Sequence, residues 1–339
     1  IVAYTTLGGF LAASTTDFIQ SIIMSVALIV VLIFGVETAG GIGAVIHNAS
    51  ELPGYLSMTL SYDVNTGKAA PYSALTIVST AAWGLGYFGM PHILLRFMAI
   101  EDEKKLKLSR RVATIWVVIS LFVAVFIGVI GYTMSKVGAL EMLTGSNSET
   151  IIVKISALLS QHGVIFALLA GVILAGILAS TMSTSDSQLL AASSAVSSDI
   201  LGAFRKDSSN KNGSMAAARI TLLVISVVAA FIARNPDSSV FAIVSFAWAG
   251  FGAAFGPVVL FSLFWKRTNK WGALAGMVCG GSMVFIWKYL IRPLGGIWNI
   301  YELLPAFLIA CAAIVIVSLL TPKPSKEIEE EFDRVAQMK

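Results

Sequence analysis

The sequence predicts an all-α protein that crosses a membrane several times. Hydrophobic residues occupy 57% of its 339 positions and charged residues only 12%, which is about half the charged fraction of a soluble domain. The mean hydropathy is +0.84, and apolar runs long enough to span a bilayer as a helix recur along the chain. The net charge of +4 therefore reports topology, and we expect no nucleic-acid partner.

Eight membrane-spanning segments are expected from the apolar runs. They cover residues 10–36, 74–99, 110–135, 160–200, 217–234, 240–264, 270–290 and 302–320. Residues 1–6 are expected to end an earlier helix, which the pair Gly8-Gly9 closes. The connections 37–73 and 136–159 are long and mildly apolar, so we expect them to form short helices on the outer face.

The basic residues determine the expected orientation. Seventeen of the 23 Lys and Arg residues lie in 101–112, 202–219 and 265–270, in the C-terminal tail, and at Arg96. Cytoplasmic loops carry an excess of Lys and Arg, so these connections and the tail are expected in the cytoplasm. The charged tail itself is interpreted as a solvated segment.

A row of hydroxyl groups interrupts one of the most apolar segments. Ser180, Ser183, Thr184 and Ser187 are spaced i, i+3, i+4 and i+7, so they share one face of a helix. Hydroxyl groups also line helix contacts in bilayers or bond to their own backbone, and that interpretation stays open. Asp186 lies beside the row. A carboxylate inside the membrane costs about 2.5–3.5 kcal/mol on insertion scales, so it needs a partner, water or a cation.

Asp17 is a second carboxylate within an apolar segment. No Lys or Arg lies in the apolar part of any expected helix to neutralise Asp17 or Asp186. Carboxylate and hydroxyl oxygens are hard ligands, which suit Na⁺ or H⁺. The two segments therefore predict a cation site.

The stretch WGLGYFGMPHILLRF, residues 83–97, predicts a broken helix. Gly86, Gly89 and Pro91 disfavour a continuous helix, because proline removes a backbone donor and glycine adds flexibility. Secondary transporters use broken helices to present backbone groups to a substrate at mid-membrane. Trp83 and Tyr87 would then offer two aromatic faces beside the break. The alternative is an interfacial aromatic belt with a proline kink.

A second glycine-rich stretch, FAWAGFGAAFGPVVLF, covers residues 246–261. It predicts either close helix packing through small residues or a moving gate helix. The gate interpretation assigns a hinge to five residues: Gly250, Phe251, Gly252, Phe255 and Pro257.

Four stretches together resemble signatures of a known family. They are GGFLAASTTDFIQ, WGLGYFGMPHILLRFMA, MSTSDSQLLAASSA and FAWAGFGAAFGPVVLFSLFWKR, and they resemble the sodium:solute symporter family, most closely its proline-transporting members. The resemblance covers essentially the whole chain.

The resemblance implies an inverted-repeat, leucine-transporter-like core of ten helices, of which this chain would lack the first four. Residues 1–36 would be the last helix of the first repeat, and 37–73 an outer loop. Residues 74–264 would form the second five-helix repeat, 265–320 two peripheral helices, and 321–339 a cytoplasmic tail.

The resemblance also implies roles for the candidate residues. Ser183 and Thr184 would bind the main sodium ion through their hydroxyl groups, helped by the backbone carbonyl of Ser180. A second cation site would use Asp17 with Ser183, Asp186 and Ser187. The solute would contact Trp83 and Tyr87 at the break that holds Gly86, Gly89 and Pro91. Met90 stands where a well-studied proline carrier has Gln, so this position departs from the pattern.

The implied function is Na⁺-coupled import of L-proline by alternating access in a bacterial inner membrane. Na⁺ would be the coupling ion, with no further cofactor and no enzymatic activity, since no nucleophile-elbow or zinc-hydrolase motif occurs. The alternatives are a sodium symporter for another amino acid, betaine or a carboxylate, and the input domain of a membrane sensor. The oligomeric state stays open, and a chain without the first four core helices is not expected to transport by itself.

Overall fold

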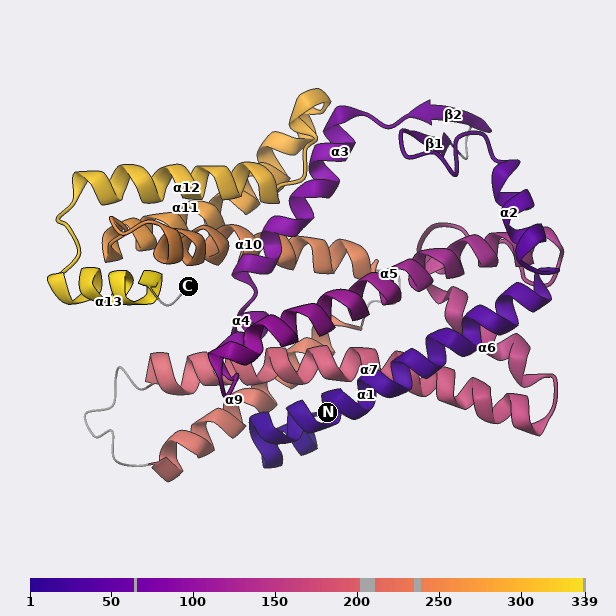
Figure 1. The fold of residues 1–339 in the computed structure, drawn as a ribbon, viewed down its shortest axis with the longest axis horizontal. Coiled ribbons are helices and arrows are strands. Elements are labelled where there is room, and N and C mark those ends of the chain that lie inside the picture. The colour runs from indigo at the N-terminus through magenta and orange to yellow at the C-terminus, as the bar shows by residue number, and fades with distance from the viewer. Residues whose placement is uncertain (64–65, 202–210, 235–238, 338–339) are drawn as a thin grey trace. The chain divides into compact units, whose positions relative to one another are not determined.

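The protein is described by a computed structural model that covers residues 1–63, 66–201, 211–234 and 239–337. It is built almost entirely of helices (Figure 1). Seven helices in the described part are long and apolar enough to cross a membrane, by length and composition. The predicted all-α membrane fold is confirmed at this level. The eighth expected segment, 74–99, consists of three short helices in succession. Much of the basic connection 202–219 lies outside the described residues.

The chain divides into two compact units. Unit 1 comprises Ile1–Pro71 and Ile100–Asp237, and unit 2 comprises Tyr72–Ala99 and Ser238–Lys339. Unit 1 holds the helices and strands α1 (Val2–Thr38), α2 (Ile42–Ser50), β1 (Leu60–Asp63), β2 (Lys68–Pro71), η2 (Glu103–Lys105), α5 (Leu106–Lys136), η3 (Gly145–Thr150), α6 (Ile151–Ser160), α7 (Val164–Ser194), η4 (Ala195–Ile200) and α9 (Lys211–Ile232).

Helices α1 and α7 run side by side in opposite directions (Figure 1). Small residues allow this close approach, because a Cβ atom at Gly176 of α7 would lie 2.6 Å from the Ala27 methyl group of α1. Further along the pair, Val31 and Ile173 are fully buried in one cluster with Ile130 of α5. This cluster is the core of unit 1.

The first helix is broken at Gly9, whose φ of 58° and ψ of −147° lie outside the helical region. Glycine adopts this conformation without the steric cost that a Cβ atom brings. The break separates a short segment, residues 2–8, from the long part of α1. The segment folds back, because Tyr4 lies near Thr16 and Gln20. In a straight helix, twelve residues would place Tyr4 about 18 Å from Thr16.

The connection 37–73 holds the expected short helix, α2, together with an antiparallel hairpin of β1 and β2. The hairpin was not anticipated from the sequence. Glu51, just after α2, pairs with Lys136 at the end of α5 and with His47, whose Nε2 lies 3.3 Å from Glu51 Oε1. These contacts attach the connection 37–73 to the end of α5.

The Glu51 contact predicts a pH dependence of stability. The hydrogen bond from Lys136 and its charge lower the pKa of the Glu51 carboxyl group below the ordinary value of 4.5. Such a carboxylate stabilises the fold above its unfolded pKa, and this contribution is lost as the pH falls through the folded pKa. The difference in melting temperature between wild type and Glu51→Gln should therefore be present at neutral pH, begin to shrink near pH 4.5, and vanish once the pH is below the lowered pKa of the folded state. A difference that persists at acidic pH would contradict this assignment.

Unit 2 contains the remaining helices. They are α3 (Ala74–Ala81), η1 (Ala82–Gly89), α4 (Pro91–Met98), α10 (Val240–Phe264), α11 (Lys270–Ile286), η5 (Trp287–Ile291), η6 (Arg292–Leu294), η7 (Gly296–Trp298), α12 (Leu303–Leu320) and α13 (Lys326–Gln337). The fully buried residues of its core include Ala249, Leu303 and Ala306.

Glycines bring the helices of unit 2 together. A Cβ atom at Gly280 of α11 would lie 2.8 Å from the Ala253 carbonyl carbon of α10, and one at Gly276 would overlap Ile314 of α12. The three helices therefore pack with their backbones close together (Figure 1).

The C-terminal helix α13 is tied to the connection between α10 and α11. Lys266 Nζ lies 2.6 Å from Asp333 Oδ2 and 3.8 Å from Glu329. The hydrogen bond to Asp333 raises the pKa of Lys266. The expected solvated tail is thus a charged helix held by ion pairs at its surface.

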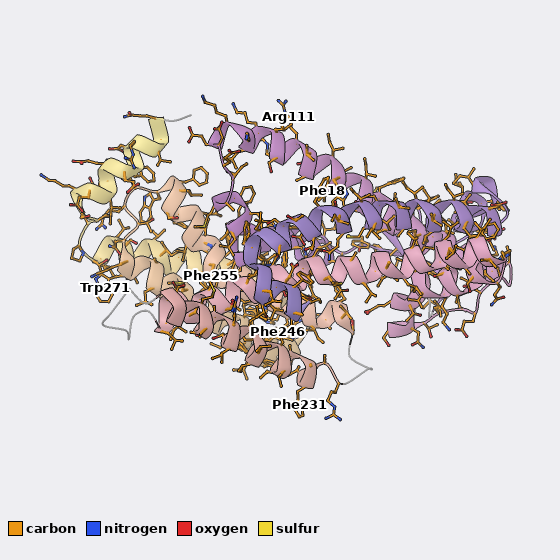
Figure 2. The ribbon with its side chains drawn as sticks, turned by 90° about the horizontal axis from the view of Figure 1, so that it is seen from below. Phe18, Arg111, Phe231, Phe246, Phe255 and Trp271 are labelled. Carbon is orange, nitrogen blue, oxygen red and sulfur yellow. The ribbon has the colours of Figure 1, made fainter. Side chains whose placement is uncertain are left out.

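Large apolar side chains point outward from the long helices of both units (Figure 2). Phe18 on α1, Phe231 on α9 and Trp271 on α11 each have half or more of their surface exposed. Outward-facing apolar surface on long helices is the pattern expected of segments in contact with lipid.

Candidate functional site

Three of the predicted sodium ligands lie on one turn of α7. The hydroxyl groups of Ser183 and Thr184 both donate to the backbone carbonyl oxygen of Ser180, at 3.1 and 3.3 Å. Ser187 continues the row and donates to the Ser183 carbonyl at 3.1 Å. Each hydroxyl group uses its hydrogen in these bonds, so its oxygen lone pairs can still accept or ligate. The row thus offers several oxygens along one face of α7.

Asp186 is the most buried polar group of this region, with 0% of its surface exposed. The Tyr4 hydroxyl group donates to Asp186 Oδ2 at 2.9 Å. The Ser187 hydroxyl oxygen lies 3.3 Å from Oδ1 and shares its single hydrogen between this oxygen and the Ser183 carbonyl. Among the described residues, no Lys, Arg or His pairs with this carboxylate. A buried carboxylate with hydroxyl donors and no basic partner has the chemistry of a site for a monovalent cation.

Asp17 lies at the same depth as Asp186 along the α1–α7 pair. The contact of Gly176 with Ala27 sets the antiparallel register, and ten residues back on α1 correspond to ten residues forward on α7. A second observation supports this register: Thr16 and Gln20, on either side of Asp17, lie near Tyr4, and Tyr4 bonds to Asp186. Asp17 is half-buried. All the predicted cation residues therefore belong to unit 1.

The predicted solute residues belong to unit 2, where Trp83 lies in an aromatic cluster. Its ring stacks on Trp248 with the ring centroids 5.4 Å apart, on Phe241 at 5.6 Å and on Tyr301 at 6.0 Å. The Trp248 Nε1–H group donates to the Trp83 carbonyl oxygen at 2.9 Å. Tyr87 packs edge-on against Trp248 at 4.7 Å and keeps 49% of its surface exposed. The cluster presents one accessible ring beside a break in the helix.

The broken segment itself packs on α10. A Cβ atom at Gly86 would overlap the Trp248 ring, and one at Gly89 would lie 2.8 Å from Gly256 N and 2.9 Å from Gly252 Cα. The 3₁₀ helix η1 ends there, Met90 is extended, and Pro91 begins α4 at a position that suits proline. These glycines are needed for close contact between backbones.

The predicted hinge residues lie within an unbroken helix. Helix α10 runs from Val240 to Phe264 with Pro257 inside it. Gly252 and Pro257 are buried, while Phe251 and Phe255 are largely exposed and stack on each other at 6.1 Å. Gly250 has open space where a Cβ atom would stand. One structure shows one state of this helix, so its role as a gate stays a prediction.

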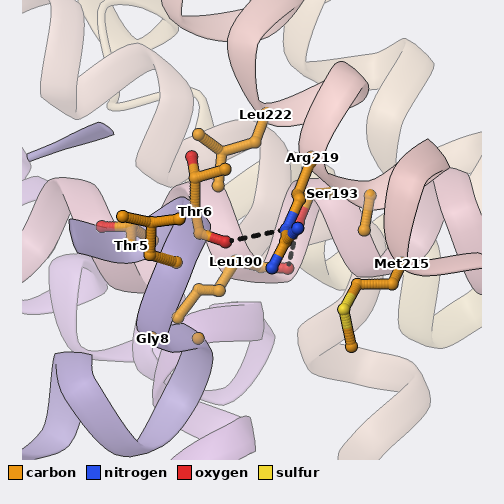
Figure 3. Close-up of a pocket in the computed structure, with 11 residues that line it drawn as sticks. Thr5, Thr6, Gly8, Leu190, Ser193, Met215, Arg219 and Leu222 are labelled. Carbon is orange, nitrogen blue, oxygen red and sulfur yellow. Dashed lines mark hydrogen bonds between the residues drawn. The ribbon is translucent and has the colours of Figure 1, made fainter. Parts of the chain in front are cut away.

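A cavity of about 270 Å³ lies beside the folded-back segment (Figure 3). It is lined by Thr5, Thr6, Leu7, Gly8, Gly9, Leu190, Ser193, Met215, Ala218, Arg219 and Leu222. Arg219 Nε donates to the Thr6 carbonyl oxygen at 3.2 Å. This bond fastens the segment before Gly9 to α9.

Five residues of these clusters were not among the predicted site residues: Tyr4, Gln20, Phe241, Trp248 and Tyr301. Gln20 is 8% exposed, and among the described residues its Oε1 atom has no hydrogen-bond partner. Two of them could have been suspected from the sequence. Gln20 lies three positions after Asp17, and Tyr4 comes shortly before the Gly8-Gly9 pair. The contacts of Trp248 and Tyr301 with Trp83 join residues 165 and 218 positions apart, so no local pattern could reveal them.

The fold and these clusters define a multi-pass α-helical membrane protein with an oxygen-rich stretch of α7 around the buried Asp186 and a glycine-broken aromatic segment. The family model described as "Sodium:solute symporter family" matches residues 1–280. The chain belongs to the sodium:solute symporter family.

Curated relatives match nearly the whole chain. A protein named sodium/proline symporter from Haemophilus influenzae is 40% identical, over 98% of this chain and 64% of its own length. The osmoregulated proline transporter OpuE of Bacillus subtilis is 38% identical, over 96% of this chain and 62% of its own length. The high-affinity proline transporter PutP of Bacillus subtilis is 38% identical over 98% and 66%. The chain thus spans 62% to 66% of the length of these relatives.

Proposed function

We propose that the protein is a Na⁺-coupled symporter that imports L-proline into a bacterial cell by alternating access. The observation that carries the proposal is the buried Asp186 carboxylate with its hydroxyl donors and no basic partner among the described residues. Membership of the sodium:solute symporter family supports sodium as the coupling ion. The names of relatives, which refer to proline, support the solute.

The main sodium ion is bound by the hydroxyl oxygens of Ser183 and Thr184 and by the carbonyl oxygen of Ser180. What supports this assignment is that both hydroxyl groups converge on the Ser180 carbonyl within one turn of α7. A second cation is bound by Asp17 with Ser183, Asp186 and Ser187. Each charge that crosses a potential of 100 mV contributes about 2.3 kcal/mol, so sodium entry can drive solute accumulation.

Proline packs its apolar ring on the accessible ring of Tyr87, beside the half-buried Trp83. Backbone groups of the broken segment around Gly86, Gly89 and Pro91 meet its charged ends, as broken helices do in secondary transporters. The glycines contribute backbone alone, since they lie against α10. Bending of α10 at the residues around Gly252 and Pro257 then accompanies the change of access.

The proposal includes the location and orientation of the chain. It lies in the bacterial inner membrane. The connections rich in Lys and Arg and the helix α13 face the cytoplasm, since basic residues are in excess on that side of membrane proteins. In the ten-helix core, residues 1–36 end the first repeat and 74–264 form the second. The helices within 265–320 are peripheral.

The direct test is uptake of labelled proline by cells that lack their own proline carriers and express the complete gene. Uptake should require sodium in place of potassium and should be competed by unlabelled proline. Stronger competition by betaine, another amino acid or a carboxylate would overturn the assignment of proline and leave the sodium site standing. Uptake that is equal in sodium and potassium would overturn the coupling ion.

A further inference from the structure

Tyr4 reaches Asp186 from a part of the chain 182 residues away. The segment before Gly9 folds back across α1, so the Tyr4 hydroxyl group lies beside the side chains of Thr16 and Gln20 and donates to Asp186 Oδ2. A residue that enters a buried carboxylate site from a separate helical segment needs the Gly9 break to arrive there. The conformation of Gly9 and the Tyr4 contact therefore belong together.

The Asp186 carboxylate has capacity left after these contacts. Tyr4 bonds to one of its oxygens and Ser187 to the other, and each carboxylate oxygen has two acceptor positions. The Tyr4 bond fixes one carboxylate oxygen, and acceptor positions remain on both oxygens. The buried Gln20 Oε1 atom, which has no hydrogen-bond partner among the described residues, lies on the same turn of α1 that Tyr4 packs against.

We propose that Tyr4 is a positioning residue for the second cation, and this inference rests on the proposed function. Its hydroxyl group holds the Asp186 carboxylate in the orientation that binds a monovalent cation. Without that bond the carboxylate can rotate, and the cation must order it on binding. A carboxylate that is no longer ordered before binding lowers the affinity for the cation, although no ligand atom has been removed.

A second contact allows two roles of Tyr4 to be distinguished by experiment: positioning the Asp186 carboxylate, and merely holding the segment 2–8 in place. Arg219 donates to the Thr6 carbonyl oxygen and so holds the same segment to α9 (Figure 3). Arg219→Gln removes this contact with α9 and keeps the Tyr4 hydroxyl group. Tyr4→Phe does the reverse, because it keeps the ring and removes only the hydrogen bond.

The experiment compares Tyr4→Phe with wild type in the complete protein. Sodium dependence of uptake should shift to concentrations about tenfold higher, which corresponds to about 1.4 kcal/mol. The proline concentration for half-maximal uptake, measured at saturating sodium, should stay within about twofold. Tyr62→Phe, in the outer hairpin, is the matched control and should change neither value.

A double-mutant cycle tests whether Tyr4 acts through Asp186. In an Asp186→Asn background, adding Tyr4→Phe should cause no further shift in sodium dependence. A tenfold shift in both backgrounds, or none in the wild-type background, would overturn the inference. A shift of the same size in Arg219→Gln would also overturn it, because fastening of the segment would then suffice.

A binding measurement keeps this inference separate from the proposed function. Sodium should raise the melting temperature of the purified wild-type protein relative to potassium, since a ligand that binds the folded state stabilises it. Tyr4→Phe should need about tenfold more sodium for the same rise and should melt like wild type in potassium. If that result holds while proline uptake is absent, the solute assignment fails and the Tyr4 inference stands. If sodium does not stabilise the wild type, the Tyr4 inference fails.

Discussion

Replacing Ser183 and Thr184 together by alanine is expected to raise the sodium concentration for half-maximal proline uptake by at least about tenfold, a loss of about 1.4 kcal/mol or more. The two hydroxyl oxygens are the proposed side-chain ligands of the main sodium ion. Folding should be little affected, because among the described residues both hydroxyl groups bond only to the Ser180 carbonyl of their own helix. Such local bonds add little to helix stability. The measurement is uptake across a range of sodium concentrations at constant ionic strength.

Thr181→Ala provides the matched control for this double variant. Thr181 lies on the same helix and donates to the Ile177 carbonyl at 3.2 Å, in the same way as the two ligands. It is outside the predicted hydroxyl row and should leave sodium dependence unchanged. A ligand shifts an equilibrium only by its difference in affinity for two states. Unchanged sodium dependence in the variant Ser183→Ala with Thr184→Ala would therefore contradict the assignment of the sodium site to this turn of α7.

The second large effect is expected from Gly89→Ala, which should lower the stability of unit 2 by about 1–3 kcal/mol or more. A methyl group at Gly89 would meet the Phe251 carbonyl oxygen, Gly256 N and Gly252 Cα of α10. These are backbone atoms, so no side chain can rotate away to make room. We expect a lower melting temperature of the purified protein, because the added methyl group forces the broken segment away from α10. Uptake should fall as well, because the proposed solute residues lie on this segment.

Gly84→Ala tests the same segment without the contact. Gly84 lies on η1 and has no neighbouring atom within 4 Å of the Cβ position. Alanine there should leave the melting temperature at the wild-type value or above it. Equal melting temperatures for Gly89→Ala and Gly84→Ala would show that η1 and α10 are not in close contact in the folded protein.

Composition and local periodicity were sufficient to predict the long helices. They also predicted the broken segment, because glycine and proline act within a few residues of themselves. The expected short helix in 37–73 is present as α2, whereas the β1–β2 hairpin was missed since its strands are only four residues each. The break at Gly9 was anticipated, but its consequence was not: the reversal that carries Tyr4 to Asp186 depends on tertiary contacts.

The candidate site could be predicted only in part for the same reason. The hydroxyl row follows from helical spacing and has the expected order along α7. The partners of Trp83, by contrast, come from the distant residues Trp248, Phe241 and Tyr301. Local sequence shows that an aromatic side chain lies near a break, but it cannot show which other rings cover it.

The division of the chain into two compact units has a consequence for the coupling of sodium movement to proline movement. The oxygen-bearing residues proposed for sodium belong to one unit, and the rings proposed for proline belong to the other. Damage confined to one set should leave the other ligand's intrinsic affinity nearly intact. Such variants would then show slippage, in which one ligand crosses without the other. An ion current without solute, or solute exchange without an ion gradient, would be the electrical and isotopic signature of that failure.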